Sequence, residues 1–202
     1  MKLIEAYQKL EQLNDAALQT RDAAGILGIT PGHASKLLER LAEVGLVVHL
    51  NKGLWGFPKL MNTLVLPRYL SAPFPSYVSL QTALYAHDMI EQIPIVTYSV
   101  TLGRTKQVST PLGEVSFHHL DPSFFFGFEI NESTGVALAS PEKALVDFFY
   151  LSAAKSRLFS ALPEVQLPEK FDREAASKMI QKIPFQKRRS LVERKFENFF
   201  VH

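Results

Sequence analysis

The chain of 202 residues contains no cysteine. This absence excludes disulfide bonds, thiolate nucleophiles, iron–sulfur clusters and every zinc site that uses a cysteine ligand. It also suits a reducing compartment. Without disulfides the chain depends on a hydrophobic core, and its 47% apolar and 21% charged residues are typical of a globular protein.

An unbroken apolar run is missing from the start of the chain. Residues Met1 to Leu18 alternate charged and apolar side chains. A signal peptide needs an uninterrupted apolar stretch, and a membrane-spanning helix needs about 20 apolar residues. We therefore expect no membrane association and a cytoplasmic location.

Common catalytic motifs are absent as well. The sequence has no glycine-rich phosphate loop after an expected strand and no Gly-x-Ser-x-Gly motif. Four of its histidines, His87, His118, His119 and His202, lack the helical spacing of a metal site. Adjacent His118 and His119 are expected to face opposite sides of a strand. We therefore expect no enzyme activity, no bound metal and no cofactor.

Neither sign of charge is in large excess. The chain has 22 Lys and Arg residues against 20 Asp and Glu residues, for a net charge of +2. This excess is too small to indicate nucleic-acid binding by itself, so any basic surface must be local.

Proline concentrates in one stretch of the chain. Pro58, Pro67, Pro73 and Pro75 all fall within 18 residues or so, and proline disfavours helix both at itself and at the preceding residue. We therefore predict a linker there. The expected domains are an N-terminal domain over residues 1–57, a proline-rich linker over 58–76 and a C-terminal domain over 77–202.

Apolar periodicity and turn residues predict an α+β fold. In the N-terminal domain helices are expected over residues 2–13, 20–27 and 31–44, followed by strands over 46–50 and 54–57. In the C-terminal domain the expected helices are 80–91, 141–154, 173–183 and 185–200, and the expected strands are 94–101, 105–109, 113–119 and 134–138. The fold class is thus a winged helix-turn-helix domain followed by a mixed α+β domain that ends in helices.

Residues 20–45 have the pattern of two short helices joined by a tight turn. Thr20 is expected to cap the first helix and Gly28 to end it. Thr30 is expected to cap the second helix, with Pro31 at its first position, where a missing N–H has no cost. The second helix then has a regular apolar stripe made of Ala34, Leu37, Leu38, Leu41 and Val44. This arrangement is typical of a helix-turn-helix motif.

A hairpin after the second helix would make this motif a winged helix. Its turn, Asn51-Lys52-Gly53, places Lys52 at the tip and offers a glycine for the left-handed position. The only tryptophan, Trp55, is expected on the returning strand, packed against the helices or beside the DNA backbone.

DNA contacts of a winged helix come from its recognition helix and its wing. The expected DNA-binding residues are His33, Ser35, Lys36, Arg40, Asn51 and Lys52. Glu39 and Glu43 are unfavourable on such a face, so we expect them to point away from DNA or to pair with Arg40 and Lys36. The alternative is a helical module used for packing or dimerisation.

The most specific motif lies in the second half of the chain. Ala139-Ser140-Pro141-Glu142-Lys143-Ala144-Leu145-Val146-Asp147, after the winged helix, resembles the signature of the AbiEi-like antitoxins of the AbiE (type IV) toxin–antitoxin systems. The resemblance covers nearly the full chain in order and character. It implies an N-terminal domain that binds double-stranded operator DNA and represses its own operon.

The resemblance also implies a C-terminal domain that counteracts a nucleotidyltransferase-like toxin. In type IV systems the two proteins are thought not to form a stable complex, so the toxin is a functional partner and not an expected binding partner. A plain regulator with no toxin partner stays open, as does a non-catalytic module that uses the winged helix to bind protein. A dimer or a cooperative assembly on DNA stays open too.

Residue chemistry alone explains most of that motif as the start of a helix. Ser140 is a good N-cap, Pro141 a good first residue, and Glu142 is favourable in the first turn. Lys143 and Asp147 are four residues apart and could pair on one face of the helix, which usually contributes about a few tenths of a kcal/mol. A role of Glu142, Lys143 and Asp147 in counteracting a toxin is the alternative.

The end of the chain is strongly basic. Between Lys178 and Lys195 seven basic residues stand against the single acid Glu193. The surface is expected either to be merely solvated or to contact a partner such as DNA phosphates or an acidic toxin. The candidate partner residues in this segment are Lys187, Arg188, Arg189, Arg194 and Lys195.

Overall fold

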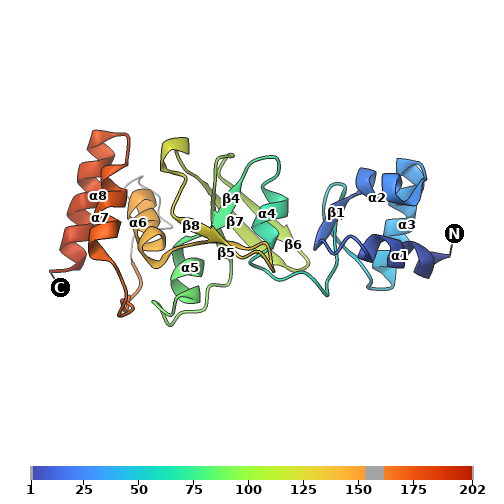
Figure 1. Cartoon of the computed structure of the whole chain (residues 1–202), viewed down its shortest axis with the longest axis horizontal. Coiled ribbons are helices and arrows are strands. Elements are labelled where there is room, and N and C mark those ends of the chain that lie inside the picture. Colours follow the sequence, from blue (N-terminus) through green and yellow to red (C-terminus); the bar gives the residue numbers. More distant parts are fainter. Residues whose placement is uncertain (1, 153–161, 202) are drawn as a thin grey trace.

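The computed structural model describes residues 2–152 and 162–201. Within these ranges the fold is mixed α+β, with eight α-helices and two sheets. Figure 1 shows the parts in a row: the N-terminal helices at one end, the larger sheet in the middle, and α7 and α8 at the other end beyond α6. No described helix is long and apolar enough to cross a membrane.

The N-terminal unit combines three helices with a three-stranded antiparallel sheet of order β1-β3-β2. Its elements are α1 (Leu3–Glu11), β1 (Ala17–Gln19), α2 (Thr20–Leu27), α3 (Pro31–Glu43), β2 (Val48–Asn51) and β3 (Leu54–Gly56). The three helices and the hairpin occur where the sequence predicts them, whereas β1 was not predicted. It is only three residues long and gains its hydrogen bonds from β3, far along the chain.

The turn between α2 and α3 follows the expected chemistry. Gly28 adopts φ +63°, a left-handed conformation that glycine tolerates without strain. The Thr30 hydroxyl accepts a hydrogen bond from the His33 backbone N–H at 3.3 Å, and Pro31 is the first residue of α3. The N-cap of α2, however, is Gln19 and not Thr20. The Asp22 carboxylate accepts from the Gln19 N–H at 3.3 Å, which leaves the Thr20 hydroxyl for another partner.

The buried stripe of α3 is confirmed at four of its five positions. Ala34, Leu37, Leu38 and Leu41 are at most 5% exposed. Val44 is 60% exposed, so its assignment to the stripe is wrong. The helix ends at Glu43, and Gly45 turns the chain at φ +72°, which takes Val44 off the helical face.

The second unit is built on a six-stranded mixed sheet of order β6-β7-β5-β4-β9-β8. Its strands are β4 (Ser76–Val78), β5 (Thr97–Thr101), β6 (Lys106–Thr110), β7 (Gly113–His119), β8 (Phe128–Ile130) and β9 (Ala137–Ala139). Its helices are α4 (Leu66–Leu70), α5 (Leu80–Ala86), the 3-10 turn η1 (Pro122–Phe124), α6 (Pro141–Ser152), α7 (Arg173–Gln181) and α8 (Gln186–Phe199). Residues 153 and 154 of the expected helix 141–154 lie outside the described residues.

Helix α5 is shorter than the sequence predicts. It ends at Ala86, because His87 caps it and Asp88 takes a positive φ of +55°. The residues expected to continue the helix to 91 instead form a loop. Met89 and Ile90 in that loop are buried. Their apolar side chains continue the periodic pattern of the helix, and the sequence therefore predicted a longer helix.

The segment 58–76, predicted as a linker, contains helix α4 and the first residue of β4. Leu66 and Leu70 of α4 are buried in one apolar cluster with Leu50 and Leu54 of the hairpin and Phe117 of β7. Through this segment the two units contribute residues to one shared apolar cluster.

The main core of the second unit includes buried residues of the sheet and of the four helices α5, α6, α7 and α8. The expected stripe of α6, namely Ala144, Leu145, Phe148 and Phe149, is confirmed as buried. Helices α7 and α8 pack on α6 through Ile180 and Phe196. Figure 1 shows α6 between the sheet and this helical pair.

Candidate nucleic-acid interface

Helix α3 presents a polar face to solvent. Of the four residues predicted to contact DNA from this helix, His33, Lys36 and Arg40 are exposed and Ser35 is half-buried. All four lie off the buried stripe, as predicted. The structure thus leaves the side chains of this face available to a partner.

The hairpin tip is fixed by local hydrogen bonds. Asn51 and Lys52 are both exposed, and the Asn51 side-chain oxygen accepts from the Lys52 backbone N–H at 2.8 Å. Gly53 takes the left-handed conformation expected for it, with φ +69°. Lys52 therefore stands at the tip of the hairpin with its charge in solvent.

The hairpin is tied to the start of α2 through one threonine. The backbone N–H of Thr20 donates to the Gly53 carbonyl at 2.8 Å, and its hydroxyl accepts from the Trp55 indole N–H at 2.9 Å. Trp55 is only 5% exposed, so it packs against the helices, which is one of the two expected placements. The next residue, Arg21, has a side chain that is 83% exposed.

Arg21 is a basic residue of this region that sequence reasoning missed. The Thr20–Gly53 hydrogen bond places the start of α2 beside the hairpin tip, so Arg21 and Lys52 belong to the same end of the unit. The local sequence does not predict that Arg21 lies near Lys52, because their proximity depends on a hydrogen bond between residues far apart in sequence.

The two acids of α3 do not form the expected ion pairs. Glu39 accepts a hydrogen bond from the Ser35 hydroxyl at 3.1 Å. Among the described residues no ion pair joins Glu39 or Glu43 to Lys36 or Arg40. Both acids instead line a hollow of about 520 Å³ between α3 and the hairpin, together with His49 and Trp55. The expectation of pairing is therefore wrong.

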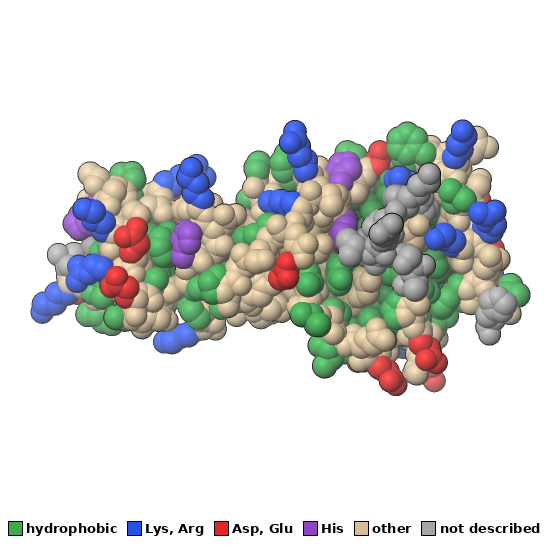
Figure 2. Space-filling view, turned by 180° about the vertical axis from the view of Figure 1, so that it is seen from behind, with side chains coloured by type: hydrophobic (Ala, Val, Ile, Leu, Met, Phe, Trp, Pro, Cys, Tyr) green, Lys and Arg blue, Asp and Glu red, His purple; other side chains and the backbone are tan. Residues whose placement is uncertain are grey.

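The charge of the N-terminal unit is balanced overall. Residues 1–57 contain six basic residues and six acidic residues, so their formal net charge is zero. Figure 2 shows Lys, Arg and His side chains interspersed with acidic ones over this end of the molecule. The basic members are Lys2, Lys9, Arg21, Lys36, Arg40 and Lys52, and the acidic ones are Glu5, Glu11, Asp15, Asp22, Glu39 and Glu43.

The motif at residues 139–147 forms the buried polar centre of the second unit. Lys143 and Asp147 make the ion pair that their spacing predicts, but both side chains are 0% exposed. The second carboxylate oxygen of Asp147 accepts from the Tyr77 hydroxyl at 3.0 Å and from the Ser79 hydroxyl at 2.8 Å. The Lys143 ammonium lies 3.8 Å from the centroid of the Phe124 ring. The pair is therefore part of the core and is not a surface pair.

Burial disfavours both charges of this pair. Desolvation lowers the pKa of Lys143 and raises the pKa of Asp147, while the attraction between the two opposes both shifts. Burial and the neighbouring Asp147 raise the pKa of Tyr77 well above its usual value. A buried pair of this kind is costly to break, because either partner alone would be an uncompensated charge.

Glu142 has a structural role as well. Its carboxylate accepts from the Ser140 hydroxyl at 2.9 Å and from the Asp172 backbone N–H at 3.1 Å, which links the start of α6 to the start of α7. The Lys143 N–H donates to the Ser140 hydroxyl at 3.2 Å, which confirms Ser140 as the cap of α6. Of the three residues proposed for partner contact, Lys143 and Asp147 are inaccessible.

The basic residues of α8 divide into two groups. Arg189 donates to the Ile183 carbonyl at 2.8 and 3.0 Å, Lys195 donates to the Ser152 hydroxyl at 2.9 Å, and the Arg188 guanidinium lies 4.5 Å from the centroid of the Tyr150 ring. These three stabilise the packing of α8. Lys187 and Arg194 are exposed and form no ion pair with the described residues.

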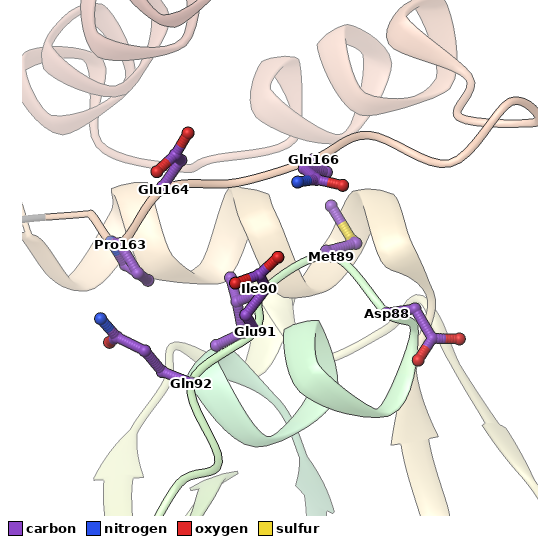
Figure 3. A pocket seen from close by; sticks show the side chains of 8 residues that line it. All are labelled: Asp88, Met89, Ile90, Glu91, Gln92, Pro163, Glu164 and Gln166. Atoms are coloured by element: carbon purple, nitrogen blue, oxygen red, sulfur yellow. The ribbon is translucent and has the colours of Figure 1, made fainter.

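A separate small hollow lies between the loop after α5 and the strand-like segment before α7. It has a volume of about 170 Å³ and includes the acids Asp88, Glu91 and Glu164 but no basic side chain. Figure 3 shows Met89 and Gln166 close together, and the Gln166 backbone N–H donates to the Met89 carbonyl at 2.8 Å. An acidic hollow of this kind does not suit nucleic acid.

The described residues contain no group of three or more histidine, aspartate or glutamate side chains that could hold a metal ion. His118 is buried and His119 exposed, so they do face opposite sides of β7 as predicted. Burial lowers the pKa of His118 to about 4. His202 lies outside the described residues.

No protein-family model and no curated protein matches the chain.

Proposed function

We propose that the N-terminal unit is a winged helix and that the protein is a DNA-binding transcriptional regulator. The observation that carries the proposal is the combination of the α2–turn–α3 unit with a hairpin tied to α2 through Thr20. In this arrangement both the polar face of α3 and the tip residue Lys52 are accessible to solvent. A recognition helix and a wing are used together in this way in winged-helix proteins.

Helix α3 has the length for major-groove recognition. Its 13 residues correspond to about 20 Å at 1.5 Å per residue, and an α-helix fits the B-DNA major groove. His33 and Lys36, in its first two turns, would reach base edges or phosphates. Lys52 and Arg21 would neutralise phosphates beside the groove.

The proposal has to account for the two acids on α3. Glu39 and Glu43 repel phosphates, so they weaken non-specific binding to DNA. A carboxylate inside the major groove accepts a hydrogen bond from the N4 amino group of cytosine, and this use gives it a role in sequence selection. We assign Glu39 that role because it lies on the polar face next to Ser35 and lines the hollow beside the hairpin.

The C-terminal unit carries the antitoxin part of the proposal. Its support is the resemblance of residues 139–147 to the AbiEi-like signature, and the buried Lys143–Asp147 pair gives that signature a structural reason. The signature would then maintain the fold of the unit. Exposed basic residues such as Lys187 and Arg194 would be the ones available to a partner.

Fluorescence anisotropy with the duplex DNA that lies upstream of the gene tests the DNA-binding proposal. Lys36→Glu should weaken binding by about tenfold or more, since it removes a contact and adds a repulsive charge. Lys9→Glu is the matched control, because Lys9 is also exposed but lies on α1. Equal affinity of both variants would overturn the assignment of α3. A failure of the wild type to bind DNA, together with formation of a stable complex between the full chain and a partner protein, would favour the protein-interaction module.

A further inference from the structure

A groove of about 550 Å³ lies where the two units meet. Its walls come from three separate segments: the loop 13–16 of the N-terminal unit, the segment 59–69, and the turn 132–135 between β8 and β9. Any ligand in this groove would touch both units. Binding sites for small molecules occur preferentially at such junctions.

Two cationic side chains face this groove. Arg68 and Lys59 line it, are both exposed, and form no ion pair with the described residues. The guanidinium of Arg68 lies 5.5 Å from the centroid of the Tyr69 ring. It also lies against the backbone of Gly135, where an added Cβ would come within 2.3 Å of its Nη1 atom. Arg68 thus lies close to Tyr69 and Gly135, and no carboxylate in the described part of the chain forms an ion pair with it.

Two acids, Asp15 and Glu132, also line the groove, and Asp15 accepts hydrogen bonds within the protein. The Asp15 carboxylate accepts from the Tyr69 hydroxyl and from the Ala16 backbone N–H at 2.9 Å. Burial and this carboxylate together raise the pKa of Tyr69 to about 12, so the phenol stays a donor. Glu132 is the other acid of the lining. Carboxylates next to cations suit a ligand that carries both an anionic group and hydroxyl groups.

The groove continues into a second hollow of about 490 Å³. Asn62 and Thr134 line both spaces, so the two hollows adjoin along these residues. The second space has mainly apolar walls, which include Leu64, Val136, Leu138, Pro141 and the exposed Ile130. The first hollow thus has the cations Lys59 and Arg68 together with two acids, Asn62 and Thr134 lie where the hollows adjoin, and the second hollow has mostly apolar walls that also include His87 and Glu129.

We propose that this groove binds a small organic phosphate with a hydroxylated middle and an apolar end, a nucleoside monophosphate being the simplest example. The phosphate would contact Arg68 and Lys59, because guanidinium and ammonium groups are the usual partners of phosphate. The sugar hydroxyls would meet Asn62 and Thr134, and the base would lie against the apolar walls. The combined volume of the two hollows lies just above the range typical of small-molecule sites.

Isothermal titration calorimetry of the full chain without DNA tests this site, using AMP, GMP, CMP and UMP at millimolar concentrations. We expect saturable binding of at least one of them. Arg68→Ala should weaken it by about tenfold, which corresponds to one charge-assisted hydrogen bond. Arg104→Ala is the matched control, since Arg104 is exposed and does not line the groove.

Two further titrations test the two ends of the groove separately. Ile130→Gln changes a residue that is 62% exposed, so it should fold normally and yet weaken nucleotide binding. Inorganic phosphate alone should bind more weakly than the nucleotide. No saturable binding of any nucleotide would overturn the proposal, and so would equal binding by wild type and Arg68→Ala. Because no DNA is present, these results are independent of the proposed DNA-binding function.

Discussion

The indole N–H of Trp55 donates a hydrogen bond to the hydroxyl of Thr20 at 2.9 Å. The same hydroxyl lies 3.3 Å from the Gly53 carbonyl, to which it donates. One side chain at the start of α2 thereby fixes the position of the hairpin. The proposed DNA interface depends on this link, because it sets where Lys52 lies relative to α3.

Replacing Thr20 should loosen the hairpin. Thr20→Val keeps the shape of the side chain but leaves the buried indole N–H without its acceptor, which should cost about 1–3 kcal/mol of unfolding free energy. Urea unfolding measures the loss, and the emission of Trp55, the only tryptophan, should shift to the red. Thr63→Val at an exposed site is the control and should change neither quantity. Wild-type stability and emission in Thr20→Val would refute the role of the link.

The Lys143–Asp147 pair should behave as a buried pair and not as a surface pair. Lys143→Met leaves the Asp147 charge buried with only Tyr77 and Ser79 as donors, and should cost about 3–5 kcal/mol of unfolding free energy. The double variant with Asp147→Asn should regain most of this loss, because it removes the second charge and keeps an acceptor for both hydroxyl groups.

The chain contains its own control for this effect. Lys178 and Glu174 form an ion pair with the same spacing of four residues at 2.7 Å, but their side chains are 72% and 78% exposed. Lys178→Met should therefore change the unfolding free energy by less than about 0.5 kcal/mol. Thermal and urea unfolding of the two single variants should differ widely, and equal losses would contradict the buried-pair account.

A fragment that ends at Pro58 should be unstable by itself. Leu50 and Leu54 of the hairpin pack on Leu66 and Phe117 of the second unit, and truncation would expose them. We expect the fragment to bind a hydrophobic dye and to unfold at a lower temperature than the full chain. Leu50→Gln in the fragment should reduce dye binding. A fragment with cooperative unfolding, full-chain stability and no dye binding would show that the shared core is dispensable.

Replacing the acid Glu39 on α3 is predicted to strengthen DNA binding, whereas Lys36→Glu is predicted to weaken it. Glu39→Gln removes a negative charge from the hollow beside the hairpin, so affinity for random-sequence duplex DNA should rise. Discrimination between the upstream duplex and random duplex should fall if Glu39 accepts from cytosine. Competition binding measures both. Glu91→Gln, at an exposed site of the second unit, is the control. Weaker random-sequence binding by Glu39→Gln would contradict the placement of α3.

Long periodic elements and the hairpin were predictable from the sequence, whereas several other short strands were not. The stripe of α3 predicts residues 31–44, and the helix covers 31–43, because its apolar spacing and its caps agree. Strands β1, β4 and β8 have three residues each and are stabilised by their neighbours in the sheets, so they carry no pattern of their own.

Helix α4 was not predicted, because the sequence has a proline within it. Pro67 lies in the first turn of α4, where a backbone N–H has no partner within the helix, so it does not break the helix. The sequence indicates a linker there because it cannot show that Leu66 and Leu70 meet residues of both units.

The candidate sites were also only partly predictable from the sequence. The exposure of His33, Lys36, Arg40 and Lys52 follows from helical and hairpin geometry, and it was predictable. The burial of Lys143 depends on Phe124 and Tyr77, which approach from other segments, so the spacing of the pair alone could not show that the pair is buried.

The salt dependence of DNA binding tests the central claim most directly. For B-DNA, log Kd changes with log salt concentration by about 0.9 per neutralised phosphate. Lys52→Ala, and separately Arg21→Ala, should each reduce this slope by about one phosphate contact, whereas Lys9→Ala on α1 should leave it unchanged. Slopes that are the same for the wild type and all three variants would contradict a DNA interface made of α3 and the hairpin.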